Sequence, residues 1–434
     1  MNYQTVVIAF TLLAIFVPQF VIAVPEFGDQ IKTTDLFAVL SVPVAFFAFM
    51  NRRSMQLVQI VAIAVICFSA TVVITNIFQS SDRRLYQENL PHLARLFSIH
   101  SLLFLVVAMP TDRQFLSRSL IAFGCLATFA SVCIAVLYHF GSGAFDAHQT
   151  FERDGGASVH RLGGLVGESG AYAFNATMGF QLLLAGLAMV NKRRLYFIAL
   201  WIVFPVLVAL IYHESLVRIS LLMSILFFLI CVTVVNHSAT ALRGLLAVSI
   251  LSVVTVVILM SAAGHPIGDI QIDRLEFDGD ANRLSSGRVA NWVEAADVWT
   301  SEPMWILFGM GHRASDFVLM HPIENMAVFH LVNYGLIGSA LFLMLYGYIF
   351  APIFKQALRG DFAGGVFSAL ILSVLVQWQV NDINLYFQTF PIVLFFSAWY
   401  SSNLRSGVDS YEQPESEPSL DSRHGEVYEL RNAL

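Results

Sequence analysis

The chain has 434 residues, of which 57% are hydrophobic and only 12% are charged, and its mean hydropathy is +0.70. Because the charged fraction is about half that of a soluble globular protein, the composition excludes that class and indicates a membrane protein. The formal net charge of −6 comes largely from the C-terminal tail, so it identifies no partner.

Apolar segments close to the roughly 20 residues that an α-helix needs to cross a bilayer recur along the chain. The first has no basic stretch before it and no small-residue cleavage pattern, so we expect a retained span and not a signal peptide. The sequence predicts an all-α polytopic integral membrane protein whose transmembrane bundle covers residues 1–401. The bundle has about twelve spanning helices, near 5–24, 35–50, 57–78, 96–110, 119–139, 170–190, 195–212, 219–236, 244–263, 327–351, 362–380 and 385–401.

Loop length and short basic turns set the predicted orientation, because basic residues near span ends resist translocation. The loops predicted to be cytoplasmic carry Arg52, Arg53, Arg113, Arg118, Lys192, Arg193, Arg194, Arg243, Lys355, Arg359 and Arg405. The opposite loops hold a single lysine and several arginines, among them Arg161, Arg218 and Arg288. We expect both termini inside and these three arginines on the outer face.

Two outer loops are unusually long, one over 141–169 and a larger one over 264–325. Within the larger loop, apolar residues recur at helical spacing and predict an amphipathic helix over 288–300. Its Trp292 and Trp299 suit an interfacial position, and Pro303 ends it. The acidic, Pro- and Ser-containing residues 402–434 predict a disordered cytoplasmic tail.

The four cysteines, Cys67, Cys125, Cys133 and Cys231, all lie within predicted spans and show no metal-ligand spacing, so we expect free thiols. The outer histidines also repeat no metal motif. We therefore expect neither a metal nor another cofactor.

Four polar motifs follow one another in the second half of the chain. A glycine-rich stretch over 160–170 carries Arg161, and Arg218 follows Ser215 at the start of a span. Ser285-Ser286-Gly287-Arg288 lies in the larger loop. Glu324-Asn325 is then followed by nine residues and by Gly335-Leu336-Ile337-Gly338.

This ordered set, over residues 160–351, resembles the O-antigen ligase and Wzy-type polysaccharide polymerase superfamily. The resemblance implies a GT-C-like architecture with a large periplasmic loop in the bacterial inner membrane. It also implies a metal-independent, inverting glycosyl transfer from a glycan carried on undecaprenyl diphosphate. In ligases of this family a histidine occupies the position of Glu324. His321 and His330 both lie outside that position, which favours a polymerase over a ligase.

The resemblance, together with the chemistry of the side chains, implies roles for six residues. Departure of the diphosphate develops negative charge, which the guanidinium groups of Arg161, Arg218 and Arg288 can bind bidentately. Glu324 would accept the proton of the attacking sugar hydroxyl. Asn325 would orient the carboxylate or the sugar, and we expect His321 beside them as a substrate contact.

Plainer structural roles explain the same residues. Arg161 and Arg288 fit solvated loop charges or phospholipid contacts, and Arg218 fits a side chain that snorkels to the interface. Glu324 fits a carboxylate favoured by the helix dipole, and Asn325 an N-cap. Gly335 and Gly338 favour close helix packing over ligand contact. The polar residues between Gln377 and Asn384 fit an acceptor patch and an exposed turn equally, and we expect His312 in a surface loop.

Three functions remain in view. The leading one is a polymerase of lipid-linked repeat units in O-antigen or exopolysaccharide biosynthesis. The second is an O-antigen ligase that transfers the glycan to lipid A core or another acceptor. The third is a transporter or flippase of lipid-linked sugars, which broken or charged mid-span helices would favour. We expect membrane lipids as partners, a chain-length regulator and a flippase of the same pathway from the resemblance, and no nucleic acid.

Overall fold

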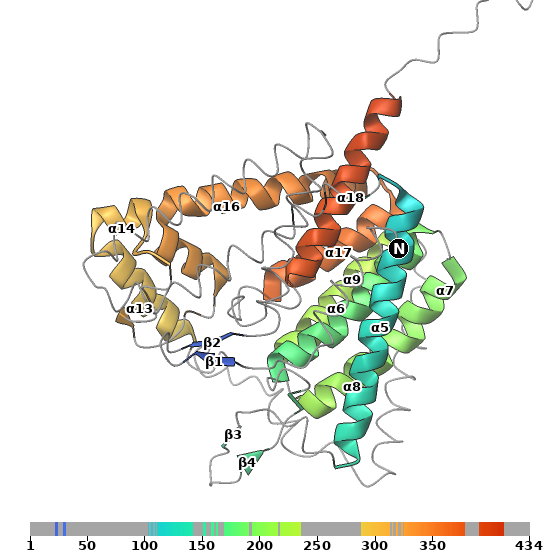
Figure 1. Cartoon of the computed structure of the whole chain (residues 1–434), viewed down its shortest axis with the longest axis horizontal. Helices are drawn as coiled ribbons and strands as arrows, with labels where there is room; N and C mark the ends of the chain where they lie inside the picture. Colours follow the sequence, from blue (N-terminus) through green and yellow to red (C-terminus); the bar gives the residue numbers. More distant parts are fainter. Residues whose placement is uncertain are drawn as a thin grey trace, which may run out of the picture.

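The structure is a computed structural model. It describes residues 22–24, 29–31, 103, 106, 109, 111–141, 151–152, 158–159, 162–163, 169–190, 193–215, 218–235, 288–312, 315, 318–319, 323, 325–377 and 390–411. These residues are almost entirely helical (Figure 1). Four of their helices are long and apolar enough to cross a membrane, namely Arg113–His139, Tyr172–Met189, Arg194–His213 and Met326–Leu358. An all-α membrane protein is therefore the class that the structure supports.

The described helices overlap those predicted spans from 119–139 onward that can be compared. They are α5 (Arg113–His139), α6 (Ser169–Met189), α7 (Arg193–Ile198), α8 (Phe204–Ser215), α9 (Arg218–Val235), α13 (Arg288–Thr300), α14 (Pro303–Phe308), α16 (Met326–Leu358), α17 (Phe362–Gln377) and α18 (Phe390–Tyr411). A π-helical turn, η4 (Ala199–Val203), joins α7 to α8, and the N–H of Phe204 donates to the carbonyl of Ala199. The predicted spans 35–50, 57–78 and 244–263 lie outside the described residues, as does nearly all of 96–110.

Two boundaries differ from the prediction. Strand β1 (Ile22–Val24) pairs antiparallel with β2 (Asp29–Ile31), so the last residues of the predicted span 5–24 are extended. Their β-branched side chains precede Pro25, which cannot continue a helix. At the other end, α18 continues to Tyr411, beyond the predicted start of the tail at 402. A second small hairpin pairs β3 (Phe151–Glu152) with β4 (Ser158–Val159).

Helices α5 and α6 form the closest packed pair, and they run side by side in Figure 1. A Cβ atom on Gly124 would lie 2.5 Å from the backbone nitrogen of Leu183, and one on Gly179 would lie 2.6 Å from Cβ of Ala127. The glycines therefore let the two backbones approach closely, as small residues do between membrane helices. The Tyr172 hydroxyl adds a hydrogen bond of 2.7 Å to the carbonyl of Ser131.

Helix α17 packs against α6, α9 and α16 and so joins the two halves of the described chain. The buried hydroxyl of Ser373 in α17 donates to Oε1 of Gln181 in α6 at 3.0 Å. Helix α8 packs on α6, where the rings of Phe180 and Phe204 stack with centroids 5.6 Å apart. The buried core lies among α5, α6, α8, α9, α17 and α18 and includes the inward side of α16.

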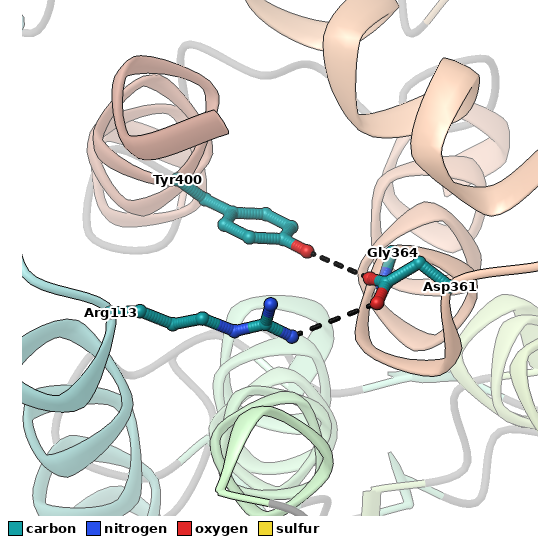
Figure 2. A network of polar contacts seen from close by, with 4 residues as sticks. All are labelled: Arg113, Asp361, Gly364 and Tyr400. Carbon is teal, nitrogen blue, oxygen red and sulfur yellow. Dashed lines mark hydrogen bonds and ion pairs between the residues drawn. The ribbon is translucent and has the colours of Figure 1, made fainter. Parts of the chain in front are cut away.

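A polar network joins the starts of α5 and α17 to the middle of α18 (Figure 2). Asp361 caps α17, because its Oδ2 accepts from the N–H of Gly364 at 2.7 Å. The same oxygen accepts from the buried Tyr400 hydroxyl at 3.3 Å, and Oδ1 lies 3.7 Å from the guanidinium of Arg113. The charge pattern predicts Arg113 and Arg359 to lie in loops on the same side of the membrane. Asp361 follows Arg359 by two residues, so the ion pair brings those two parts of the chain together.

Candidate functional site

The amphipathic helix predicted in the larger loop is present as α13, with the predicted bounds Arg288–Thr300. Its exposed side carries Glu294 and Asp297, and its Ala295 is fully buried. Trp299 packs inward and donates its indole N–H to the carbonyl of Trp305 at 2.9 Å. Trp292 and Trp299 are partly buried and both pack against the protein core, and their interfacial position stays a prediction.

Pro303 separates α13 from the next helix, and it also starts that helix. It occupies the first turn of α14, where a proline fits because its missing N–H would have no helical partner. Helix α14 ends at Phe308, and Gly309 follows with a φ of 77°. The loop predicted after Pro303 is thus a second short helix, packed against both α13 and α16 (Figure 1).

Helix α16 is broken at Gly335, which has φ 63° and ψ −171°. A Cβ atom there would lie 2.4 Å from the nitrogen of Gly309 and from the carbonyl of Leu307. A Cβ atom on Gly309 would in turn lie 2.4 Å from the carbonyl group of Asn333. The expectation that Gly335 serves close packing is confirmed, but its partner is the end of α14.

Backbone hydrogen bonds fasten the chain after α14 to the broken helix. The N–H of Met310 donates to the carbonyl of Val332 at 2.9 Å, and the N–H of Gly311 donates to the carbonyl of Asn333 at 3.0 Å. The break leaves the last carbonyls before Gly335 without their usual helical donors. The loop supplies these donors, so loop and helix form one unit.

A buried polar cluster lies directly behind this contact. His312 is fully buried, and its Nδ1 lies 2.6 Å from the hydroxyl of Tyr334. The Ser315 hydroxyl lies 3.1 Å from Oδ1 of Asn333, whose amide donates to the carbonyl of Phe329 at 2.9 Å. The sequence-based expectation that His312 lies in a surface loop is therefore wrong.

His330 extends the cluster along α16. Its buried ring meets Phe342 edge-on with centroids 4.6 Å apart, and it meets Tyr334 at 5.1 Å. Sequence reasoning singled out none of His330, Asn333 and Tyr334 as site residues. The available signal was the occurrence of His and Asn inside an otherwise apolar span, where polar groups usually have partners or a function.

Asn325 is the predicted site residue whose contacts the structure defines best. It is the N-cap of α16, and its Oδ1 accepts from the N–H of Val328 at 3.0 Å. The side chain is buried, with 8% of its surface exposed. The expected capping role is confirmed, and Glu324 is the residue immediately before this cap.

The other predicted residues divide into two groups. Arg288 is the first residue of α13 and is partly buried, and Arg218 is the first residue of α9. Arg161, His321 and Glu324 lie outside the described residues. The structure thus brings the helix of Arg288 and the helix of Asn325 into contact, while convergence of the three arginines remains a prediction.

The arrangement offers a buried, hydrogen-bonded scaffold with cationic and amide groups at helix starts, which suits anion binding. Among the described residues, no group of three or more His, Cys, Asp and Glu side chains is placed to hold a metal, and Cys125, Cys133 and Cys231 are free thiols. No protein-family model matches the chain, and no curated protein matches it.

Proposed function

We propose that the protein is a membrane glycosyltransferase that joins oligosaccharide repeat units carried on undecaprenyl diphosphate. In this proposal about twelve helices cross the bacterial inner membrane in a GT-C-like arrangement. The reaction takes place at its periplasmic face, and the product is a surface polysaccharide of the O-antigen or exopolysaccharide kind.

The observation that carries the proposal is the packing of α13 and α14 on the first part of α16. Through this packing, the elements that follow two separate sequence motifs contact each other. The motif Ser286-Gly287-Arg288 ends at the first residue of α13, and the motif Glu324-Asn325 ends at the N-cap of α16. A transferase needs an anion-binding group and a base held by a common scaffold, and the packed helices supply such a scaffold.

Two of the three arginines also begin helices. Arg218 opens α9 and Arg288 opens α13. The first N–H groups of a helix have no helical acceptor and favour negative charge, so a guanidinium at this position adds to an existing preference for phosphate. This coincidence supports the diphosphate as the group that the arginines bind.

The chemistry follows from these roles. Glu324 accepts the proton of an acceptor hydroxyl, and that oxygen forms a bond to the anomeric carbon of the donor sugar. The bond between the anomeric carbon and the diphosphate oxygen breaks, and the electron pair leaves with the diphosphate. Arginine side chains, including Arg288, stabilise the charge that develops there. Attack from the opposite face inverts the configuration of that carbon.

The test is elongation by the purified protein in detergent, with an undecaprenyl-diphosphate-linked repeat unit as the sole glycan substrate. We expect chains of several units without an energy source. Arg288→Ala should abolish elongation, and Arg288→Lys should restore little of it because the planar fork of donors is lost. Arg194→Ala is the matched control, since Arg194 is an exposed arginine at the start of another helix and should leave elongation unchanged.

The outcomes separate the three functions. In a second assay with lipid A core added as an acceptor, transfer of a single glycan to that core, with no elongation, would replace the polymerase by a ligase. Absence of any new glycosidic bond in both assays, with movement of the lipid-linked glycan across the membrane of vesicles that contain the purified protein, would indicate a transporter. Wild-type elongation by Arg288→Ala would remove the diphosphate-binding role of this residue.

A further inference from the structure

The second part of α16 carries a continuous apolar stripe on its exposed side. Its members recur at helical spacing of three and four residues, and every one is apolar. They are Leu336, Ile337, Ala340, Leu343, Met344, Gly347 and Ala351. Leu343 and Met344 are among the most exposed, at 72% and 57%. Because α16 is long and apolar enough to cross a bilayer, this stripe is the side that faces lipid.

The second part of α16 nearly matches the thickness of the membrane it would face. A rise of about 1.5 Å per residue makes the distance from Leu336 to the exposed Lys355 about 28 Å, against about 30 Å for a bilayer hydrocarbon core. Lys355 is a residue that belongs at one membrane boundary. The Gly335 end of the stripe therefore lies close to the opposite boundary.

Helix α14 supplies an apolar surface at that end. Met304 and Leu307 are 51% and 44% exposed. The carbonyl of Leu307 approaches to 2.4 Å from the position that a Cβ of Gly335 would take, and the next residue along α16 is the exposed Leu336. The exposed apolar side chains of α14 thus belong to a helix that meets α16 at the Gly335 end of the stripe.

The charged residues nearby bound this surface. Glu302 directly precedes α14 and is exposed, and the exposed side of α13 carries Glu294 and Asp297. Carboxylates are excluded from the hydrocarbon core, so these positions belong in water or at the head groups. A boundary between apolar and acidic surface therefore runs between α14 and α13.

We infer that α14 lies at the edge of the hydrocarbon core at the Gly335 end of α16, with Met304 and Leu307 in contact with acyl chains and α13 at head-group level. The partner is the bilayer itself. The inference rests on the exposure of these apolar side chains and on the contact of α14 with α16, and it holds whichever reaction the protein catalyses.

Spin labels at single cysteines test this placement in the full chain. The four native cysteines are replaced, and one cysteine is introduced as Met304→Cys or Leu307→Cys. The purified protein is then placed in vesicles of phosphatidylethanolamine and phosphatidylglycerol. Oxygen concentrates in lipid and a nickel chelate in water, so their collision rates with the nitroxide report the surroundings of each position. Leu343→Cys is the lipid control, and Asp297→Cys and Glu302→Cys are the water controls.

At Met304 and Leu307 we expect oxygen collisions to exceed chelate collisions severalfold, as at Leu343, with the reverse at Asp297 and Glu302. Chelate collisions in excess at both tested positions would place α14 in water and overturn the inference. Low collision rates with both reagents would also overturn it, because they would mean that protein, such as a second copy of the chain, covers α14. Both positions are half exposed, so the label fits without unfolding the junction.

Discussion

Two regions of this protein use glycine to bring backbones together, and they do so differently. Between α5 and α6, Gly124 and Gly179 sit in regular helices that run antiparallel. Between α14 and α16, Gly309 and Gly335 both have positive φ, and one of them breaks a helix. The first contact needs only a small side chain, whereas the second also needs a conformation that other residues rarely adopt.

The difference extends to what surrounds each contact. The α14 and α16 junction is accompanied by loop-to-helix backbone bonds and by buried His312 and Asn333. Buried polar groups fix one arrangement when they are hydrogen-bonded and are costly when they are not. The α5 and α6 contact therefore depends mainly on close packing, whereas the junction holds one defined geometry in the helix that Asn325 caps.

The largest effect should come from Gly335→Ala. The backbone of Gly335, with φ 63° and ψ −171°, lies in a region essentially confined to glycine and costs about 1–3 kcal/mol for another residue, and the added atom overpacks the junction by about 1–3 kcal/mol more. We expect faster hydrogen exchange over residues 301–319 with little change in α5 and α6. Gly347→Ala is the control, because nothing lies within 4 Å of that added Cβ. Equal exchange in both variants would contradict the strained contact.

The next largest effect concerns Glu324. Glu324→Gln should lower turnover about 10²-fold, the usual scale for a general base, while binding of the lipid-linked substrate is kept. Elongation rate and substrate affinity are measured separately on the purified protein. Glu302→Gln removes an exposed carboxylate of the same loop and should leave both values unchanged. A reduction below tenfold would make Glu324 a structural residue.

Gly124→Ala tests the other region. Its Cβ would meet the backbone of Leu183 at 2.5 Å, so the helices must separate, at a cost of about 1–3 kcal/mol. We expect a lower free energy of unfolding in detergent, with hydrogen exchange raised in α5 and α6 and not around Gly335. Unchanged stability would show that this helix pair tolerates a wider spacing.

The smallest effect belongs to Asn325, and it separates capping from chemistry. Asn325→Ala should cost about 1 kcal/mol of stability by removing the N-cap of α16, while Asn325→Ser should keep most of it. We expect elongation to fall in both variants if the amide also orients the carboxylate or the sugar. Full activity of Asn325→Ser would reduce Asn325 to a cap.

Helical periodicity made much of the fold predictable. The bounds 288–300 of α13 and the cap at Asn325 follow from local sequence, because each depends on residues one or two turns apart. The packing of the Trp299 side chain against the protein core could not be predicted from local sequence, because lipid and protein core both accommodate apolar side chains. Local patterns cannot distinguish these two environments.

The junction itself depends on contacts between distant residues. Gly335 and Gly338 lie at helical spacing, which predicts helix packing. No local sequence pattern predicts that Gly309 contacts Gly335. Burial of His312 depends on Tyr334, which lies 22 residues away in the sequence. The ion pair between Arg113 and Asp361 likewise joins helices far apart in the sequence. A single sequence shows which groups are present but not such pairings.

The break at Gly335 divides α16 into two helical segments that are held by different parts of the protein. The longer segment packs against α17 and α18, and the nine residues of the shorter one are held by the chain around Gly309 and Ser315. Substitutions in that chain would change the direction of the shorter segment and of its cap, Asn325, while the longer segment stays in place. Under the proposed function, acceptor preference could therefore change while the contacts of the longer segment stay the same.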